Sequence, residues 1–219
     1  MDTRVLARAG GGLVVVTALA AAVGPDYDTA TANGVRYFHS LGAAEVRAAP
    51  DARRDEQGAY RVCAAARLLV LPGGSPARLL AALTDTAVGR AVTEVLANGG
   101  AVSGASAGAM VLGGWTMLPE RDQAELVPGL GVVPWAVVVP HFRRGSSRMA
   151  QLREELLDRG VGEEVTVLGL PEQSGLLIDG AWVEALGSDG THLLRVGSGA
   201  SLDLSPLSAT TWPPPETGQ

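Results

Sequence analysis

The sequence has one cysteine, Cys63, no lysine, and only 4% aromatic residues among 219. A single thiol excludes an internal disulfide, and no Cys/His spacing typical of zinc sites occurs, so neither a disulfide scaffold nor a structural metal is expected. All 17 basic residues are arginines, which we attribute to codon usage. Because 47% of the residues are hydrophobic but few are aromatic, we expect a core of Ala, Val and Leu, as in helices packed closely on a sheet.

The chain also lacks an excess of positive charge, since its formal net charge is -6. This excludes a global field that would hold nucleic acid or an anionic membrane, so neither is an expected partner. The lone cysteine fits a cytoplasmic, reducing compartment. Arg4 and Arg8 before the apolar residues 13–23 leave secretion through an N-terminal signal as the alternative. We favour a buried strand at residues 13–17, because consecutive valines suit a strand covered on both faces.

Short apolar runs alternate with helical stretches along the chain. This alternation is typical of βαβ units and predicts a three-layer α/β fold, with a mostly parallel sheet and helices on both faces. The C-terminal part predicts antiparallel hairpin strands. We expect one domain over residues 1–204 and a frayed, Pro-rich tail over residues 205–219. The strands are expected at residues 13–17, 44–48, 66–71, 101–103, 135–139 and 165–168, and the main helices at residues 27–41, 76–97 and 146–159.

A candidate nucleophile lies where a short apolar strand meets a helix. The segment Ala-Val-Ser-Gly-Ala-Ser-Ala-Gly-Ala-Met, residues 101–110, contains Gly-x-Ser-x-Gly in the strand-to-helix context of a nucleophile elbow. Small residues at Gly104 and Gly108 would let neighbouring backbone pass close to Ser106. The N–H of Ala107 would then point toward a developing oxyanion. In a chain rich in Ala and Gly, the same segment could be a plain small-residue turn.

A nucleophilic serine needs a base and an orienting carboxylate, and the chain has three histidines. His141 ends an apolar run, which places it at the carboxyl end of a strand, where open parallel sheets hold their sites. For His39 and His192 a structural role is favoured. Glu172 follows another strand and is the favoured partner of the histidine. Three other acids lie between Ser106 and His141 and remain rivals: Glu120, Asp122 and Glu125.

Four segments together resemble the cyanophycinase and dipeptidase E family of serine peptidases. They are residues 101–110, Leu-Val-Leu-Pro-Gly-Gly at 69–74, His-Phe at 141–142, and Gly-Leu-Pro-Glu-Gln-Ser at 169–174. The resemblance implies a class I glutamine amidotransferase-like, flavodoxin-like fold. It also implies Ser106 as nucleophile, His141 as base and then acid, and Glu172 as orienter, without metal or organic cofactor. The oxyanion hole would use the N–H of Ala107 and one from the turn at Gly74 and Ser75.

The chain departs from this family at several points. It begins about one strand late, and an absent edge strand would favour a homodimer along the open edge. Ser-Pro replaces Asp-Gln after the Gly-Gly pair, and the arginines after His-Phe have a different spacing, which argues against cyanophycin itself. Arginines near the histidine could bind a substrate carboxylate, which favours small or aspartate-containing peptides. These candidate substrate-binding residues are Arg143, Arg144 and Arg148.

Three other functions stay open at this point. A degenerate member of the family would bind a small ligand or a partner without hydrolysis. A glutamine amidotransferase would need a cysteine at the elbow, and Cys63 lies far from it in the sequence. An α/β-hydrolase esterase shares Gly-x-Ser-x-Gly, but its acid usually precedes its histidine. The favoured function is a serine peptidase that acts through an acyl-enzyme.

Overall fold

The computed structural model describes residues 1–119, 124–143 and 147–212, and it contains two compact units. The N-terminal unit comprises Asp2–Val133. The C-terminal unit comprises Pro134–Gln219 together with Met1. The prediction of one domain over residues 1–204 stays a prediction.

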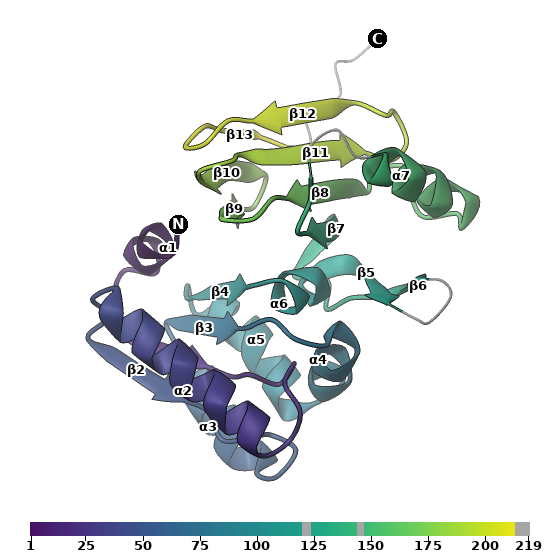
Figure 1. The fold of residues 1–219 in the computed structure, drawn as a ribbon. Coiled ribbons are helices and arrows are strands. Elements are labelled where there is room, and N and C mark those ends of the chain that lie inside the picture. Colours follow the sequence, from purple (N-terminus) through teal and green to yellow (C-terminus); the bar gives the residue numbers. More distant parts are fainter. Residues whose placement is uncertain (120–123, 144–146, 213–219) are drawn as a thin grey trace. The chain divides into compact units, whose positions relative to one another are not determined.

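The N-terminal unit is built on a four-stranded parallel sheet in the order β2-β1-β3-β4 (Figure 1). The strands are β1 (Leu13–Val16), β2 (Glu45–Ala48), β3 (Leu68–Leu71) and β4 (Ala101–Gly104). The apolar run predicted as the first strand therefore forms β1. Parallel pairing brings the carboxyl ends of all four strands to one edge, and this edge positions the serine described below.

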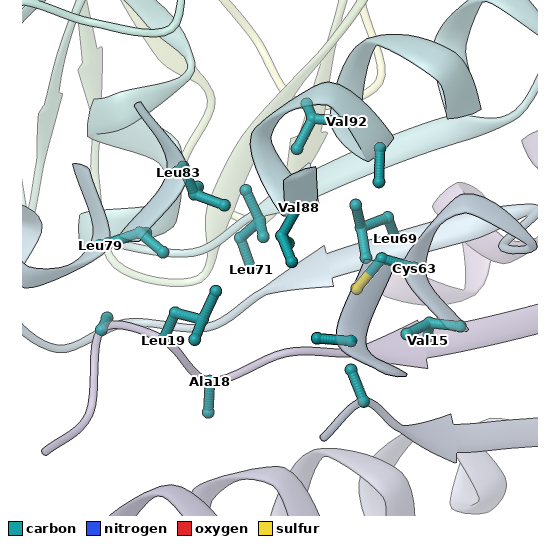
Figure 2. Packing of buried hydrophobic residues seen from close by; sticks show 14 of the residues in the cluster. Val15, Ala18, Leu19, Cys63, Leu69, Leu71, Leu79, Leu83, Val88 and Val92 are labelled. Carbon is teal, nitrogen blue, oxygen red and sulfur yellow. The ribbon is translucent and has the colours of Figure 1, made fainter. Parts of the chain in front are cut away.

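Helices cover both faces of this sheet, which confirms the three-layer prediction. On one face, Phe38 of α2 (Pro25–Ser40) packs with Val14 and Leu68, and α1 (Asp2–Arg8) adds partly buried side chains. Alternate strand residues point to the other face, where β1 and β3 pack against three helices (Figure 2). These helices are α3 (Glu56–Ala64), α4 (Pro76–Leu83) and α5 (Ala87–Ala97).

The helix predicted over residues 76–97 is two helices, α4 and α5. Asp85 between them has a φ of 56°, a left-handed conformation that no continuous helix accommodates. Thr84 is extended, and the side chain of Thr86 caps α5 by accepting a hydrogen bond from the N–H of Gly89. Proline and glycine, the usual signals of a break, are absent from this turn.

A short helix and a hairpin complete the N-terminal unit. The helix α6 (Ala107–Val111) follows β4 directly, and the antiparallel strands β5 (Gly113–Pro119) and β6 (Ala124–Pro128) come next. The hydroxyl of Thr116 in β5 donates to the carbonyl of Met110 at 3.0 Å, which ties the hairpin to α6. This hairpin was not predicted from the sequence.

In the C-terminal unit, the strands run in the order β12-β11-β8-β7. Only β7 (Val133–Pro140) and β8 (Thr166–Leu170) are parallel to each other; β11 (Thr191–Arg195) and β12 (Ser201–Leu204) are antiparallel to their neighbours. The helix α7 (Arg148–Asp158) connects β7 to β8. The predicted antiparallel C-terminal strands are thereby confirmed.

A second sheet of the C-terminal unit contains the start of the predicted tail. Its order is β13-β10-β9, from β9 (Ser174–Asp179), β10 (Trp182–Gly187) and β13 (Ala209–Thr211). Residues 209–212 are therefore not frayed, in contrast to the prediction for residues 205–219. The indole of Trp212 is buried and donates from Nε1 to the Thr166 hydroxyl at 3.0 Å. These contacts of Trp212 hold residues 209–212 in place although the segment from residue 205 is rich in turn-forming residues. Residues 213–219 lie outside the described part.

None of the described helices is long and apolar enough to span a membrane.

Candidate active site

Ser106 lies in a strained turn between β4 and α6. Its φ is 51° and its ψ is -111°, a backbone conformation that non-glycine residues rarely adopt and that costs about 1–3 kcal/mol. The Ser106 hydroxyl does not cap α6, although serine at this position usually does. This is the strand, sharp turn and helix that a nucleophile elbow requires.

The two glycines that flank Ser106 permit close backbone contacts. A Cβ on Gly104 would lie 2.4 Å from the carbonyl carbon of Gly108, and a Cβ on Gly108 would lie 1.9 Å from the carbonyl oxygen of Leu71. That oxygen also accepts a hydrogen bond from the N–H of Ala105 at 3.0 Å. The packing between β3, β4 and α6 thus requires glycine at positions 104 and 108. Gly-x-Ser-x-Gly in this chain is therefore not a chance result of its composition.

The Gly-Gly loop after β3 lies beside the serine. A Cβ on Gly73 would lie 3.2 Å from the Cβ of Ser106 and 3.7 Å from its Oγ, so glycine leaves room at the hydroxyl. Gly74 has a φ of 142°, and a Cβ there would meet the Ala20 carbonyl oxygen at 2.7 Å. This oxygen accepts the N–H of Ser75 at 3.0 Å, and the Ser75 hydroxyl caps α4. The backbone N–H and the hydroxyl of Ser75 are therefore both engaged in holding the loop.

At the start of α6, the N–H of Ala107 occupies a position without an intrahelical acceptor. Ala107 itself is buried, with 1% exposure. The backbone N–H of a first helical residue carries part of the positive end of the helix dipole. The geometry at Ser106 therefore places a suitable donor on the residue directly after the serine.

His141 and Glu172 lie together at the carboxyl edge of β7 and β8 in the C-terminal unit. The two strands are parallel, with Pro140 opposite Leu170, so the residues that follow them come to the same edge. Nδ1 of His141 lies 2.6 Å from Oε1 of Glu172. Both side chains are exposed, and a contact between two exposed polar side chains adds little to stability. The main consequence of this contact is the orientation of the imidazole.

His141 also has an unusual backbone, with a φ of 55°. The next residue holds this turn in place: the N–H of Phe142 donates to the carbonyl of Leu170 at 3.0 Å. The positive φ turns the chain sharply at the end of β7, so the imidazole is presented at the sheet edge rather than along the strand.

The remaining sequence candidates have different positions. His39 is exposed near the end of α2, with Nδ1 3.2 Å from the carbonyl oxygen of Ala43, consistent with a structural role. Among the rival acids, Glu125 lies in β6, and Glu120 and Asp122 lie outside the described residues. Of the arginines, Arg143 is exposed just after Phe142, Arg148 begins α7, and Arg144 lies outside the described residues.

A second histidine–carboxylate pair was not predicted from the sequence. Nδ1 of His192 in β11 lies 2.5 Å from Oδ1 of Asp203 in β12, and the imidazole stacks on the ring of Phe142. No sequence motif marks this pair, because it depends on the register of an antiparallel hairpin. In the described part of the chain, no group of three or more His, Cys, Asp or Glu side chains could hold a metal ion.

Comparisons with known proteins identify relatives of this chain. The chain is 28% identical over 168 residues to proteins named cyanophycinase from Trichormus variabilis and from a Nostoc species, a match over 70% of this chain and 54% of each relative. The chain thus spans about half the length of the curated relatives it matches.

Solved structures show the same fold. A peptidase from an acI-B1 actinobacterium matches with a TM-score of 0.67 and 18% identity, over 96% of this chain and 89% of that one. A putative peptidase E from Listeria monocytogenes matches with a TM-score of 0.56 and 18% identity, over 81% of this chain and 86% of that one. The model of peptidase family S51 matches residues 19–186. These residues make up most of the chain and include both the elbow and the His141–Glu172 pair, and the chain belongs to peptidase family S51.

Proposed function

We propose that this chain is a serine peptidase that hydrolyses small or aspartate-containing peptides through an acyl-enzyme. The observation that carries the proposal is the strained backbone of Ser106 in the strand–turn–helix of an S51 chain. The His141–Glu172 hydrogen bond supports it, because an oriented imidazole is the base that a serine hydroxyl needs.

In the proposed first step, Oγ of Ser106 attacks the carbonyl carbon of the peptide bond, and its proton passes to Nε2 of His141. Glu172 accepts a hydrogen bond from the Nδ1–H of His141, which leaves Nε2 as the base and stabilises the imidazolium. The N–H of Ala107 and one from the Gly74–Ser75 turn stabilise the oxyanion. Because the Ser75 N–H already donates to Ala20, the N–H of Gly74 is the better second donor.

The tetrahedral intermediate then collapses. The carbon–nitrogen bond breaks, the leaving amine takes the proton from Nε2 of His141, and the acyl group remains on Ser106. Water attacks the ester with His141 again as base, which releases the acid product and restores the serine hydroxyl. No further co-reactant is needed.

Acidic substrates are the favoured class within this proposal. Arg143 lies two residues after His141 and is exposed, and guanidinium groups bind carboxylates in bidentate fashion. Arg144 and Arg148 follow in the sequence as further candidates. With this arrangement, a carboxylate of the substrate would contribute to binding without taking part in the proton transfers.

The test is hydrolysis of a panel of α-aspartyl, β-aspartyl and neutral dipeptides, together with cyanophycin, followed by mass spectrometry. The parent should cleave at least one acidic peptide. Ser106→Ala should lower kcat/KM by about 10⁴-fold or more, as expected when a nucleophile is removed. Ser40→Ala, at an exposed serine that ends α2, should leave the rate within about twofold. A folded parent that cleaves nothing would instead favour a degenerate, ligand-binding member of the family.

The acidic preference has its own test. Arg143→Met should raise KM for acidic dipeptides by about tenfold, which corresponds to loss of a charge-assisted hydrogen bond, and should leave KM for neutral dipeptides unchanged. Arg159→Met, at an arginine that directly follows α7 and pairs with Glu155, is the matched control. Equal losses for acidic and neutral peptides would contradict a role for Arg143 in carboxylate binding.

A further inference from the structure

The side chain next to His141 is part of an aromatic stack within the C-terminal unit. Phe142 is buried, with 7% exposure. Its ring lies over Gly169 of β8, where a Cβ would come within 2.9 Å of two ring atoms. The ring also stacks on the imidazole of His192, with 5.7 Å between ring centroids and 17° between the planes. Glycine at position 169 is therefore what lets the Phe142 ring lie against the sheet.

The strand register explains why His192 is available for this stack. In the antiparallel pair of β8 and β11, His192 lies opposite Gly169. In the pair of β11 and β12, it lies opposite Asp203. His192 thus lies next to Gly169 of β8 on one side and next to Asp203 of β12 on the other.

Asp203 fixes the orientation of the His192 ring. Nδ1 of His192 lies 2.5 Å from Oδ1 of Asp203. The torsion that turns an imidazole about its Cβ–Cγ bond is otherwise broad, so a bond to one ring nitrogen defines the plane that Phe142 meets. The Asp203 side chain is 57% exposed and that of His192 is 23% exposed, which makes the pair a minor contributor to stability.

Phe142 in turn constrains His141. The backbone of His141 is strained, and such a conformation persists only where its surroundings hold it. Two contacts of Phe142 do so: its N–H bond to Leu170 and the packing of its ring against Gly169 and His192. If the ring lost its support, the backbone at His141 could relax and the imidazole would leave Glu172.

We propose that His192 and Asp203 are positioning residues, which hold His141 in its orientation toward Glu172 through the ring of Phe142. The part that concerns catalysis rests on the proposed function of His141 as the base. His192 supplies a flat ring of fixed orientation, and neither of its nitrogens takes part in the reaction. An aromatic ring of another kind at position 192 should therefore replace it in part.

The first measurement is spectroscopic and does not depend on activity. The chain has three histidines, so His39→Gln, His192→Phe and His141→Gln assign every imidazole in a ¹H–¹⁵N spectrum. In the parent, the Nδ1 proton of His141 should resonate far downfield because Glu172 accepts it, and Glu172→Gln should shift it upfield. In His192→Ala and Asp203→Ala this resonance should broaden or disappear. In His192→Phe it should persist.

The second measurement separates orientation from binding. His192→Ala should lower kcat by about 10–100-fold with KM within about twofold, since a small misplacement of a catalytic group costs rates of this order. Asp203→Ala should lower kcat less, and His192→Phe should stay within about threefold of the parent. His39→Gln, at an exposed histidine of the N-terminal unit, should match the parent. Thermal unfolding confirms that each variant is folded.

The outcomes are distinct. An unchanged His141 resonance in folded His192→Ala would overturn the proposal, whatever the rates are. Equal loss of kcat in His192→Ala and His192→Phe with the His141 resonance intact would also overturn it, and would assign the imidazole of His192 a direct role. If the parent hydrolyses no peptide, the proposed function fails, while the spectra still decide whether His192 positions His141.

Discussion

Cys63 is the only cysteine of the chain, and its burial argues against a catalytic role. It is fully buried in α3 against the parallel sheet (Figure 2). Burial disfavours the thiolate and raises the pKa of Cys63 to about 12. A thiol with this pKa has a thiolate fraction on the order of 10⁻⁴ at pH 8, and the thiolate is the reactive form. A cysteine-dependent amidotransferase reaction does not fit such a residue.

We therefore predict that iodoacetamide at pH 8 leaves the folded protein unlabelled and its hydrolytic rate unchanged. Intact mass measures the labelling, and the same sample in concentrated urea should take up one label. Cys63→Ala should keep the parent rate, although removal of a buried sulfur costs some stability. Loss of activity in step with labelling would refute this prediction and return the amidotransferase hypothesis to consideration.

The proximity of His141 and Glu172 could be predicted from the sequence because each follows an apolar strand, and the sharp turn at Ser106 could be predicted from Gly-x-Ser-x-Gly. Parallel strands bring their carboxyl ends to one edge, so position along the chain predicts position in space. The His141–Glu172 contact agrees with that expectation. The pair of His192 and Asp203 could not be predicted in this way, because the Gly-Ser-Gly turn between β11 and β12 indicates a hairpin but does not determine which residues of the two strands lie opposite each other.

At the scale of elements, sequence patterns predicted strands better than helix ends. The two central strands of the N-terminal unit, β1 and β3, are short runs of apolar residues, and burial on both faces requires such runs. The turn between α4 and α5 has no comparable signal: Asp85 adopts a left-handed conformation that glycine would adopt more readily. At this turn, the capping contact of Thr86 determines where α5 begins.

Thr86 supplies that contact, which leads to a stability prediction. Its Oγ accepts the N–H of Gly89 at 3.1 Å and donates to the carbonyl of Ala82 at 2.9 Å. Thr86→Ala should lower the free energy of unfolding by about 1 kcal/mol, the usual effect of losing an N-cap. Urea unfolding followed by circular dichroism measures the change. Thr93→Ala, at an exposed position within α5, is the control. A change below about 0.3 kcal/mol for Thr86→Ala, smaller than any usual cap effect, would show that the helix boundary is held by other contacts.

At the scale of the whole molecule, we expect the ionisation of two buried groups, Tyr27 and Cys63, to lower the free energy of unfolding at alkaline pH. Tyr27 is buried and its hydroxyl donates to the carbonyl of Ala49 at 2.9 Å. Burial raises the pKa of Tyr27 to about 12, from 10.0, and burial raises that of Cys63 to about 12, from 9.0. Both groups are acids whose folded pKa exceeds the unfolded one, so the folded state binds their protons more tightly than the unfolded state.

Linkage then fixes the sign: the contribution of these two groups is complete below about pH 9 and is lost as the pH rises through about 12. We predict that the urea midpoint of unfolding is flat from pH 7 to about pH 9 and falls above it. The double variant Tyr27→Phe and Cys63→Ala removes both titrating groups, so it should be less stable at pH 8 but should lose less stability between pH 9 and pH 11. Parallel curves for the parent and the double variant would show that other groups set the alkaline limit.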